Sequence, residues 1–140
     1  MIKICFVCTG NTCRSIMAER LLKKMIKDKK IDNIKVSSRG ILAKGENIAQ
    51  NAKLVLKECR ASVANRKAVK LGKIDKDTLY IAMTENQKAQ VKSDKVISMK
   101  SLLGEDIADP FGQSIEEYRK VAQKLILANQ VLLDKIFEHK

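Results

Sequence analysis

One short segment constrains the fold of this chain more than any other. Residues 8–14 read Cys-Thr-Gly-Asn-Thr-Cys-Arg and separate an apolar run, Ile2–Val7, from a helical pattern that begins at Ser15. A loop between a strand and a helix presents backbone N–H groups, and together with the helix N-terminus these form an anion site. The segment therefore predicts an α/β fold with a phosphate-binding loop after the first strand.

Two side chains give this loop a chemistry beyond anion binding. Cys8 lies in a positive field that favours a thiolate, so we expect it to be a nucleophile. Arg14 carries a planar cationic fork that suits phosphate oxygens, and a cation at a helix N-terminus is unfavourable unless an anion lies beside it. These are the parts needed to attack a phosphoryl group. The alternative for Cys8 is a small residue that only ends the strand, and the alternative for Arg14 is an ordinary surface arginine.

The remaining chain alternates strand and helix patterns, which predicts a four-stranded parallel sheet with helices on both faces and a single domain over residues 1–140. The expected strands are Ile2–Val7, Ile34–Ser38, Thr78–Met83 and Lys95–Ser98. The expected helices are Ser15–Lys29, Asn47–Cys59, Glu85–Val91 and one that starts at Ser114. The stretch Ala61–Lys76 is compatible with a short helix. Met99–Gly112 predicts a long functional loop.

The motifs at both ends of the chain resemble those of the low-molecular-weight protein-tyrosine phosphatases. Cys-x5-Arg-Ser follows an N-terminal strand, and Asp109-Pro110-Phe111 comes late in the chain. The resemblance implies that Cys8 forms a phosphocysteine, that Arg14 binds the phosphoryl oxygens and that Asp109 is the general acid. Glu105 and Asp106 are competing acids, and an Asp-Pro turn is the structural alternative for Asp109.

The other loop residues have predicted supporting roles. Gly10 is expected to adopt a positive φ and to let the backbone approach phosphate closely. Asn11 tolerates a left-handed conformation and holds the loop through its side chain, and Thr9 completes the phosphate-binding loop. Ser15 is a helix N-cap, and the resemblance adds stabilisation of the thiolate as a leaving group. Cys13 is either a redox partner of Cys8 or a small filler residue.

Thr12 and Phe111 are the expected walls for the substrate. Many tyrosine-specific members have an apolar residue at the position of Thr12, whereas the bacterial branch with Cys-Thr-Gly-Asn-Thr-Cys-Arg-Ser resembles the protein-arginine phosphatases. A hydroxyl suits the polar leaving group of phosphoarginine, so phosphoarginine is favoured slightly over phosphotyrosine. The chain departs from the family at Ile16, at Phe111-Gly112 and at Arg66, where a histidine is expected; this last change puts a hydrogen bond towards Asn11 in doubt.

Other functions fit less well. A cysteine phosphocarrier lacks the arginine, and an arsenate reductase of this fold needs two further cysteines beyond Cys59. The net charge of +12 allows nucleic-acid binding, but the charge is scattered and aromatic residues make up only 4% of the chain. We therefore expect phosphorylated proteins as substrates and inorganic phosphate as a product, without a nucleic-acid partner.

Cysteine usage and hydropathy complete the expectations. Cys5, Cys8, Cys13 and Cys59 lack zinc-type spacing, and the only histidine is His139, so no metal or cofactor is expected. No apolar stretch approaches the roughly 20 residues of a membrane span. A disulfide framework is not expected either. The sequence thus predicts a cytoplasmic, redox-sensitive monomer that does not associate with a membrane.

Overall fold

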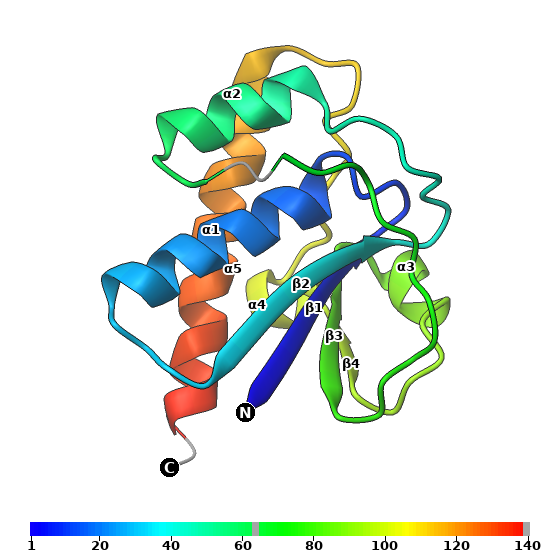
Figure 1. The fold of residues 1–140 in the computed structure, drawn as a ribbon, viewed down its shortest axis with the longest axis vertical. Coiled ribbons are helices and arrows are strands. Elements are labelled where there is room, and N and C mark those ends of the chain that lie inside the picture. The colour runs from blue at the N-terminus through cyan, green and yellow to red at the C-terminus, as the bar shows by residue number, and fades with distance from the viewer. Residues whose placement is uncertain (63–64, 139–140) are drawn as a thin grey trace.

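Four parallel strands form one sheet in the computed structural model, which describes residues 1–62 and 65–138. The strands are β1 (Ile2–Cys8), β2 (Ile34–Gly40), β3 (Thr78–Ala82) and β4 (Val96–Ser98). Their order is β2-β1-β3-β4, so β1 lies inside the sheet (Figure 1). Cys8 pairs with Gly40 at the carboxyl end of this strand. The predicted fold class is confirmed.

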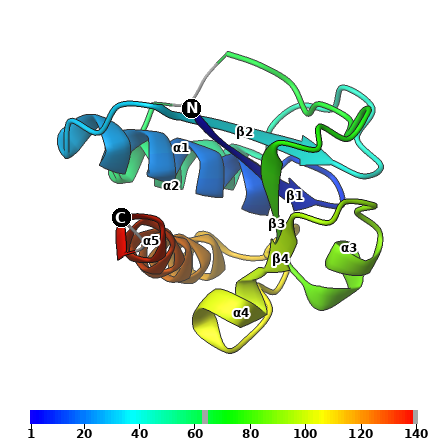
Figure 2. The ribbon, with the colours of Figure 1, turned by 90° about the horizontal axis from the view of Figure 1, so that it is seen from below.

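Helices lie on both sides of the sheet but cover them unequally. They are α1 (Arg14–Asp28), α2 (Gln50–Glu58), α3 (Glu85–Ala89), α4 (Met99–Leu103) and α5 (Ile115–Glu138). Figure 2 shows α1, α2, α4 and α5 on one side of the sheet and α3 on the other. The short helix α3 and irregular chain therefore cover the second face.

Alternating side chains of β1 reach both faces, because successive residues of a strand point in opposite directions. Ile4 and Phe6 pack in the larger core under α1 and α5, whereas Cys5 and Val7 pack with Tyr80 in a smaller core. The continuous apolar run of β1 is thus explained by burial on both faces, as is usual in parallel sheets.

Most element boundaries agree with the sequence prediction to within two residues, and three segments differ by more. The described part of Ala61–Lys76 contains no helix; instead, its backbone binds the end of β2, with the N–H of Gly40 donating to the carbonyl of Val69 (2.8 Å). The predicted loop Met99–Gly112 contains α4. Helix α2 begins at Gln50 rather than Asn47, because the N–H of Ala49 is held by the carbonyl of Thr12 (3.0 Å).

Candidate active site

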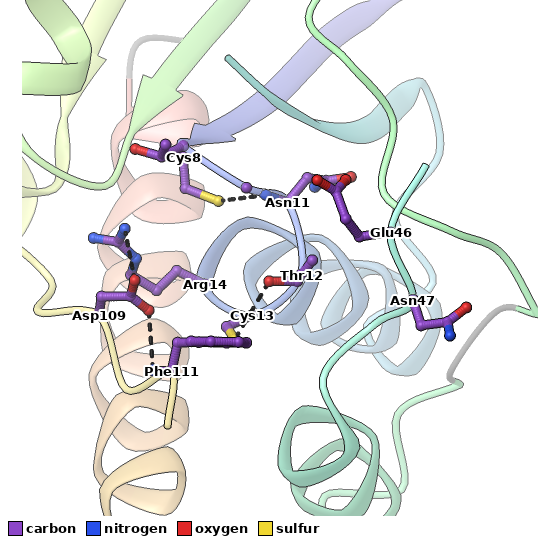
Figure 3. Close-up of a pocket in the computed structure, with 11 residues that line it drawn as sticks. Cys8, Asn11, Thr12, Cys13, Arg14, Glu46, Asn47, Asp109 and Phe111 are labelled. Carbon is purple, nitrogen blue, oxygen red and sulfur yellow. Dashed lines mark hydrogen bonds and ion pairs between the residues drawn. The ribbon is translucent and has the colours of Figure 1, made fainter. Parts of the chain in front are cut away.

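The loop between β1 and α1 forms the floor of a cavity of about 390 Å³. Figure 3 shows Cys8, Arg14 and Asp109 on one side of this pocket and Glu46 and Asn47 on the other. The structure brings together nearly all residues predicted from the sequence, and Ser15 lies behind the loop. The full set of lining residues is Cys8, Thr9, Gly10, Asn11, Thr12, Cys13, Arg14, Glu46, Asn47, Asp109 and Phe111.

The sulfur of Cys8 is surrounded by hydrogen-bond donors. The backbone N–H of Asn11 donates to Sγ at 3.1 Å, and the hydroxyl of Ser15 lies 2.9 Å from the same sulfur. Hydrogen bonds to a charged acceptor are stronger than those to a neutral one, so both groups are placed to bind the sulfur when it carries negative charge during the reaction. Ser15 can therefore donate to Cys8. It lies within the first turn of α1, whose N-cap is Cys13, so the predicted N-cap role of Ser15 is wrong.

Asn11 holds the loop in shape from within. Its backbone is left-handed (φ 58°), and its side-chain amide donates to Ser15 Oγ at 2.7 Å and to Ser38 Oγ at 3.0 Å. The N–H of Val69 donates to Asn11 Oδ1 at 3.0 Å. The predicted positive φ at Gly10 is wrong, because Asn11 makes the left-handed turn, which its short polar side chain tolerates.

Gly40 lets β2 approach this loop closely. A Cβ at this position would lie 2.8 Å from the carbonyl carbon of Gly10 and 2.9 Å from the backbone nitrogen of Asn11. Real Cβ atoms do not come so close to backbone atoms. The loop can thus pack on the end of β2 only because residue 40 is a glycine.

A buried charged network supports Asn11 from behind. The hydroxyl of Ser38 donates to Glu19 Oε1 at 2.8 Å and accepts from Arg66 at 2.6 Å, and Arg66 also lies 3.2 Å from Glu19 Oε1. Burial lowers the pKa of Arg66, while Glu19 opposes this shift. Arg66 therefore supports Asn11 through Ser38, and the hydrogen bond doubted from the sequence is replaced by this indirect link.

Arg14 and Asp109 lie next to each other on one side of the pocket (Figure 3). Arg14 donates to the carbonyl of Ile107 at 2.9 Å, and its second terminal nitrogen lies 3.8 Å from Asp109 Oδ2. The Arg14 side chain is 8% exposed and that of Asp109 is 54% exposed. The guanidinium is thus fixed at the pocket floor, while the carboxyl stands at its accessible rim.

The other carboxyls near Asp109 have different surroundings. Glu105 pairs with Lys124 at 2.5 Å, and Asp106 accepts the N–H of Glu85 at 3.1 Å; neither lines the pocket. Asp109 Oδ1 accepts the N–H of Phe111 at 3.1 Å, so the Asp-Pro turn forms as well. The geometry favours Asp109 over Glu105 and Asp106 as the general acid, because of the three only Asp109 lines the pocket. The Asp-Pro turn does not prevent this position of its carboxyl.

Cys13 is buried beneath the pocket. Its sulfur lies 3.7 Å from the hydroxyl of Thr12 and 3.4 Å from the hydroxyl of Tyr118 on α5. Burial raises the pKa of the Cys13 thiol, and burial with the bond to Cys13 raises the pKa of Tyr118. Cys13 is therefore a thiol near neutral pH.

Sequence reasoning missed several neighbours of the loop. Glu46 and Asn47 line the pocket, and Gln87 donates to the hydroxyl of Thr9 at 3.0 Å. Gly45 (φ 82°) provides a turn directly before Glu46, but no motif distinguishes this turn from others in the sequence. Only the path of the chain between β2 and α2 places Glu46 and Asn47 at the pocket, and Gln87 reaches Thr9 from α3.

No metal site is evident in the described residues, since none of their His, Cys, Asp and Glu side chains gather in groups of three or more. His139 lies outside the described residues. Among the helices of residues 1–62 and 65–138, none has the length and apolar character to cross a membrane.

The fold and the cysteine-arginine loop define a phosphate-binding α/β protein of the cysteine-dependent phosphatase class. Residues 3–140 match the profile of a family described as low molecular weight phosphotyrosine protein phosphatase. The chain therefore belongs to this family and is a phosphoprotein phosphatase.

The similar proteins include both protein-arginine and protein-tyrosine phosphatases. The chain is 37% identical to a protein-arginine-phosphatase of Geobacillus stearothermophilus, over 97% of this chain and 94% of the relative. It is 36% identical to the low molecular weight protein-tyrosine-phosphatase PtpB of Staphylococcus haemolyticus, over 89% and 92% of the two chains. The solved structure of YwlE arginine phosphatase from Geobacillus stearothermophilus is similar, with a TM-score of 0.87, 38% identity and coverage of 99% and 95%. A YwlE variant with a phosphorylated active-site serine has a TM-score of 0.80 and 31% identity, over 96% of each chain.

Proposed function

We propose that this phosphatase prefers phosphoarginine to phosphotyrosine. The observation that carries the proposal is the polar lining of the pocket, to which Thr12, Glu46 and Asp109 contribute beside a single aromatic residue, Phe111. A planar, cationic guanidinium finds charge and hydrogen-bond partners on such a lining. A phenyl ring gains mainly from apolar and aromatic contacts, and Phe111, which is 66% exposed, offers few of them.

Glu46 strengthens this argument because its carboxyl is held in the charged form. The backbone N–H of Lys44 donates to Glu46 Oε1 at 2.6 Å, and this bond lowers the pKa of Glu46. The carbonyl of Glu46 accepts the N–H of Ala68 at 2.8 Å, which fixes the backbone at the pocket wall. A fixed negative charge at this wall attracts the cationic part of phosphoarginine in an otherwise basic protein.

The first chemical step is an in-line attack by Cys8 on phosphorus. The S–P bond of a phosphocysteine forms while the bond from phosphorus to the guanidino nitrogen, or to the phenolic oxygen, breaks. Arg14 and the loop N–H groups bind the phosphoryl oxygens and stabilise the charge that develops on them. Asp109 donates a proton to the departing atom, which contributes on the order of 10²–10⁴-fold to such a step.

The second step releases inorganic phosphate. Asp109, now ionised, takes a proton from the attacking water, the new O–P bond forms and the S–P bond breaks. Ser15 lies 2.9 Å from the sulfur and donates to the thiolate that leaves. One carboxyl therefore serves both steps in turn, as acid and then as base.

Substitution of Thr12 tests the substrate preference. Thr12→Ile replaces the hydroxyl with a larger apolar group, which crowds a guanidinium and packs on a phenyl ring. We expect kcat/KM to fall on a phosphoarginine peptide and to rise on the matched phosphotyrosine peptide, with discrimination of about 1–3 kcal/mol. A wild type that prefers phosphotyrosine and changes little on substitution would show that this is a tyrosine phosphatase in the strict sense.

The oligomeric state and the cellular location of the enzyme are proposals that rest on the sequence. We propose that residues 1–140 act as one phosphatase domain, as a cytoplasmic monomer. Light scattering coupled to size-exclusion chromatography measures the oligomeric state. Cell fractionation with an antibody to the protein tests the location.

A further inference from the structure

Two adjoining hollows, one against α1 and one against α2, lie outside the active-site pocket. The first, of about 210 Å³, is lined by Arg20, Lys23, Lys24, Lys27, Asp28, Arg60 and Ser62. The second shares Arg60 and Ser62 and is also lined by Gln50, Lys53, Leu54, Lys57 and Ala61. Figure 1 shows that α1 and α2 run side by side from the active-site end of the molecule. The two hollows thus form one surface, which we call the α1–α2 basic surface.

Positive charge dominates this surface. Arg20 and Lys23 pair with the buried Glu19, and Lys24 pairs with Asp28 at 2.6 Å. The other four cations take part in none of the ion pairs formed by the described residues; they are Lys27, Lys53, Lys57 and Arg60. Several cations are therefore available to an anionic partner.

The backbone at the shared edge of the hollows adds a second observation. Arg60 follows the C-cap of α2 and has a left-handed backbone (φ 59°), with its N–H donating to the carbonyl of Lys57 at 3.0 Å. Glycine is the residue most easily accommodated at such a position. An arginine there accepts backbone strain, and it places a cation between the two hollows.

We propose that the α1–α2 basic surface binds an acidic segment of the phosphorylated protein substrate. The active-site pocket of about 390 Å³ takes a modified side chain, and a contact outside it can add selectivity among proteins that carry the same modification. Carboxylates complement the unpaired lysines and Arg60, and no aromatic side chain lines either hollow to stack on nucleic-acid bases.

Helix geometry sets the spacing between the two contacts. Arg14 begins α1 at the pocket, and Lys27 lies near its far end. At a rise of about 1.5 Å per residue, the two are about 20 Å apart along the helix. An extended peptide covers this distance in about six residues. The acidic residues of the substrate are therefore expected about six residues from the phosphorylated one.

Matched peptides test the proposal in the full-length protein. Each carries the phosphorylated residue that the enzyme hydrolyses faster, so the result does not depend on the arginine preference. Acidic peptides have four glutamates about six residues to either side of that residue, and neutral ones have glutamines. We expect the wild type to hydrolyse one acidic peptide with roughly tenfold higher kcat/KM at low ionic strength, since exposed ion pairs each contribute little but add up. The advantage shrinks in salt.

Charge-reversal variants separate docking from general electrostatic attraction. The triple variant Lys27→Glu, Lys57→Glu, Arg60→Glu is expected to lose the advantage and to retain wild-type kcat/KM on para-nitrophenyl phosphate. In the Arg60→Gly variant glycine adopts the left-handed backbone without strain, so we expect the protein to keep its melting temperature. The variant also removes one cation, so docking of the acidic peptide should weaken. The matched control is Lys76→Glu, Lys92→Glu, Lys95→Glu, which makes the same charge change around a hollow beside α3.

Three results would overturn the proposal. The first is equal hydrolysis of the acidic and neutral peptides by the wild type. The second is a control triple variant that loses as much of the preference for the acidic peptide as the docking variant. The third is displacement of the acidic peptide by a single-stranded oligonucleotide at lower concentration than by a glutamate-rich peptide, which assigns the surface to nucleic acid instead.

Discussion

Gly40→Ala is the substitution by which the packing of the loop on β2 can be measured. The new Cβ would lie 2.8 Å from the carbonyl carbon of Gly10 and 2.9 Å from both the nitrogen and the Cβ of Asn11. Carbon atoms in contact prefer about 3.5–4.0 Å, so the loop must move by roughly 0.6–1.2 Å. A displacement of about 1 Å of reacting groups can cost on the order of 10²-fold in rate. Overpacking of this kind costs about 1–3 kcal/mol of stability.

The assay compares steady-state hydrolysis of an aryl phosphate with the binding of phosphate and with thermal unfolding. Gly72→Ala is the control, because an added Cβ there meets no atom within 4 Å and the backbone has no positive φ. We expect Gly72→Ala to keep full activity and to gain slightly in stability, since alanine restricts the unfolded chain. If the Gly40→Ala variant keeps the wild-type kcat/KM, the loop and the end of β2 do not pack so closely that a Cβ at residue 40 displaces the loop.

Two further predictions concern the nucleophile, its acid and its redox protection. The Cys8→Ser variant should lose turnover and still bind phosphate or vanadate, because Arg14 and the loop N–H groups remain. The Asp109→Ala substitution should slow hydrolysis most for substrates with poor leaving groups. An unchanged rate on an alkyl phosphate would exclude Asp109 as the acid. Peroxide should inactivate the wild type reversibly, as a Cys8 sulfenic acid condenses with the Cys13 thiol to a disulfide and water. The Cys13→Ser variant should recover less activity than the wild type after treatment with a thiol reductant. Equal recovery of the two proteins would show that Cys13 does not protect Cys8.

Strong local signals made the fold and the floor of the pocket predictable. The apolar run of β1 and the amphipathic pattern of α1 are periodic over many residues, so the loop between them is fixed by its neighbours. The boundaries that were wrong depend on contacts distant in sequence. Helix α2 starts late because Ala49 is bound to Thr12, and the segment after Ala61 follows β2 because its N–H and C=O groups pair with Gly40. Periodicity contains no information on such pairings.

The pocket walls were less predictable than the floor for the same reason. Glu46 has no sequence pattern that sets it apart, and it lines the pocket because the turn at Gly45 returns the chain to the loop. Gln87 lies on the predicted short helix, but its bond to Thr9 depends on how α3 sits against β3. Side chains that reach a site from separate elements become visible only when the elements are placed in space.

Arg66 shows how a departure from the family pattern can be accommodated. A histidine at this position would titrate near neutral pH, whereas arginine stays protonated. The guanidinium binds both Ser38 and Glu19, and the buried carboxyl of Glu19 compensates its charge. The three residues come from different parts of the chain, so the compensation could not be predicted from the sequence around residue 66. Because arginine stays protonated between about pH 5 and pH 8, the range in which a histidine would change its charge, we expect the side chain of residue 66 to hold Ser38 in the same way across that range.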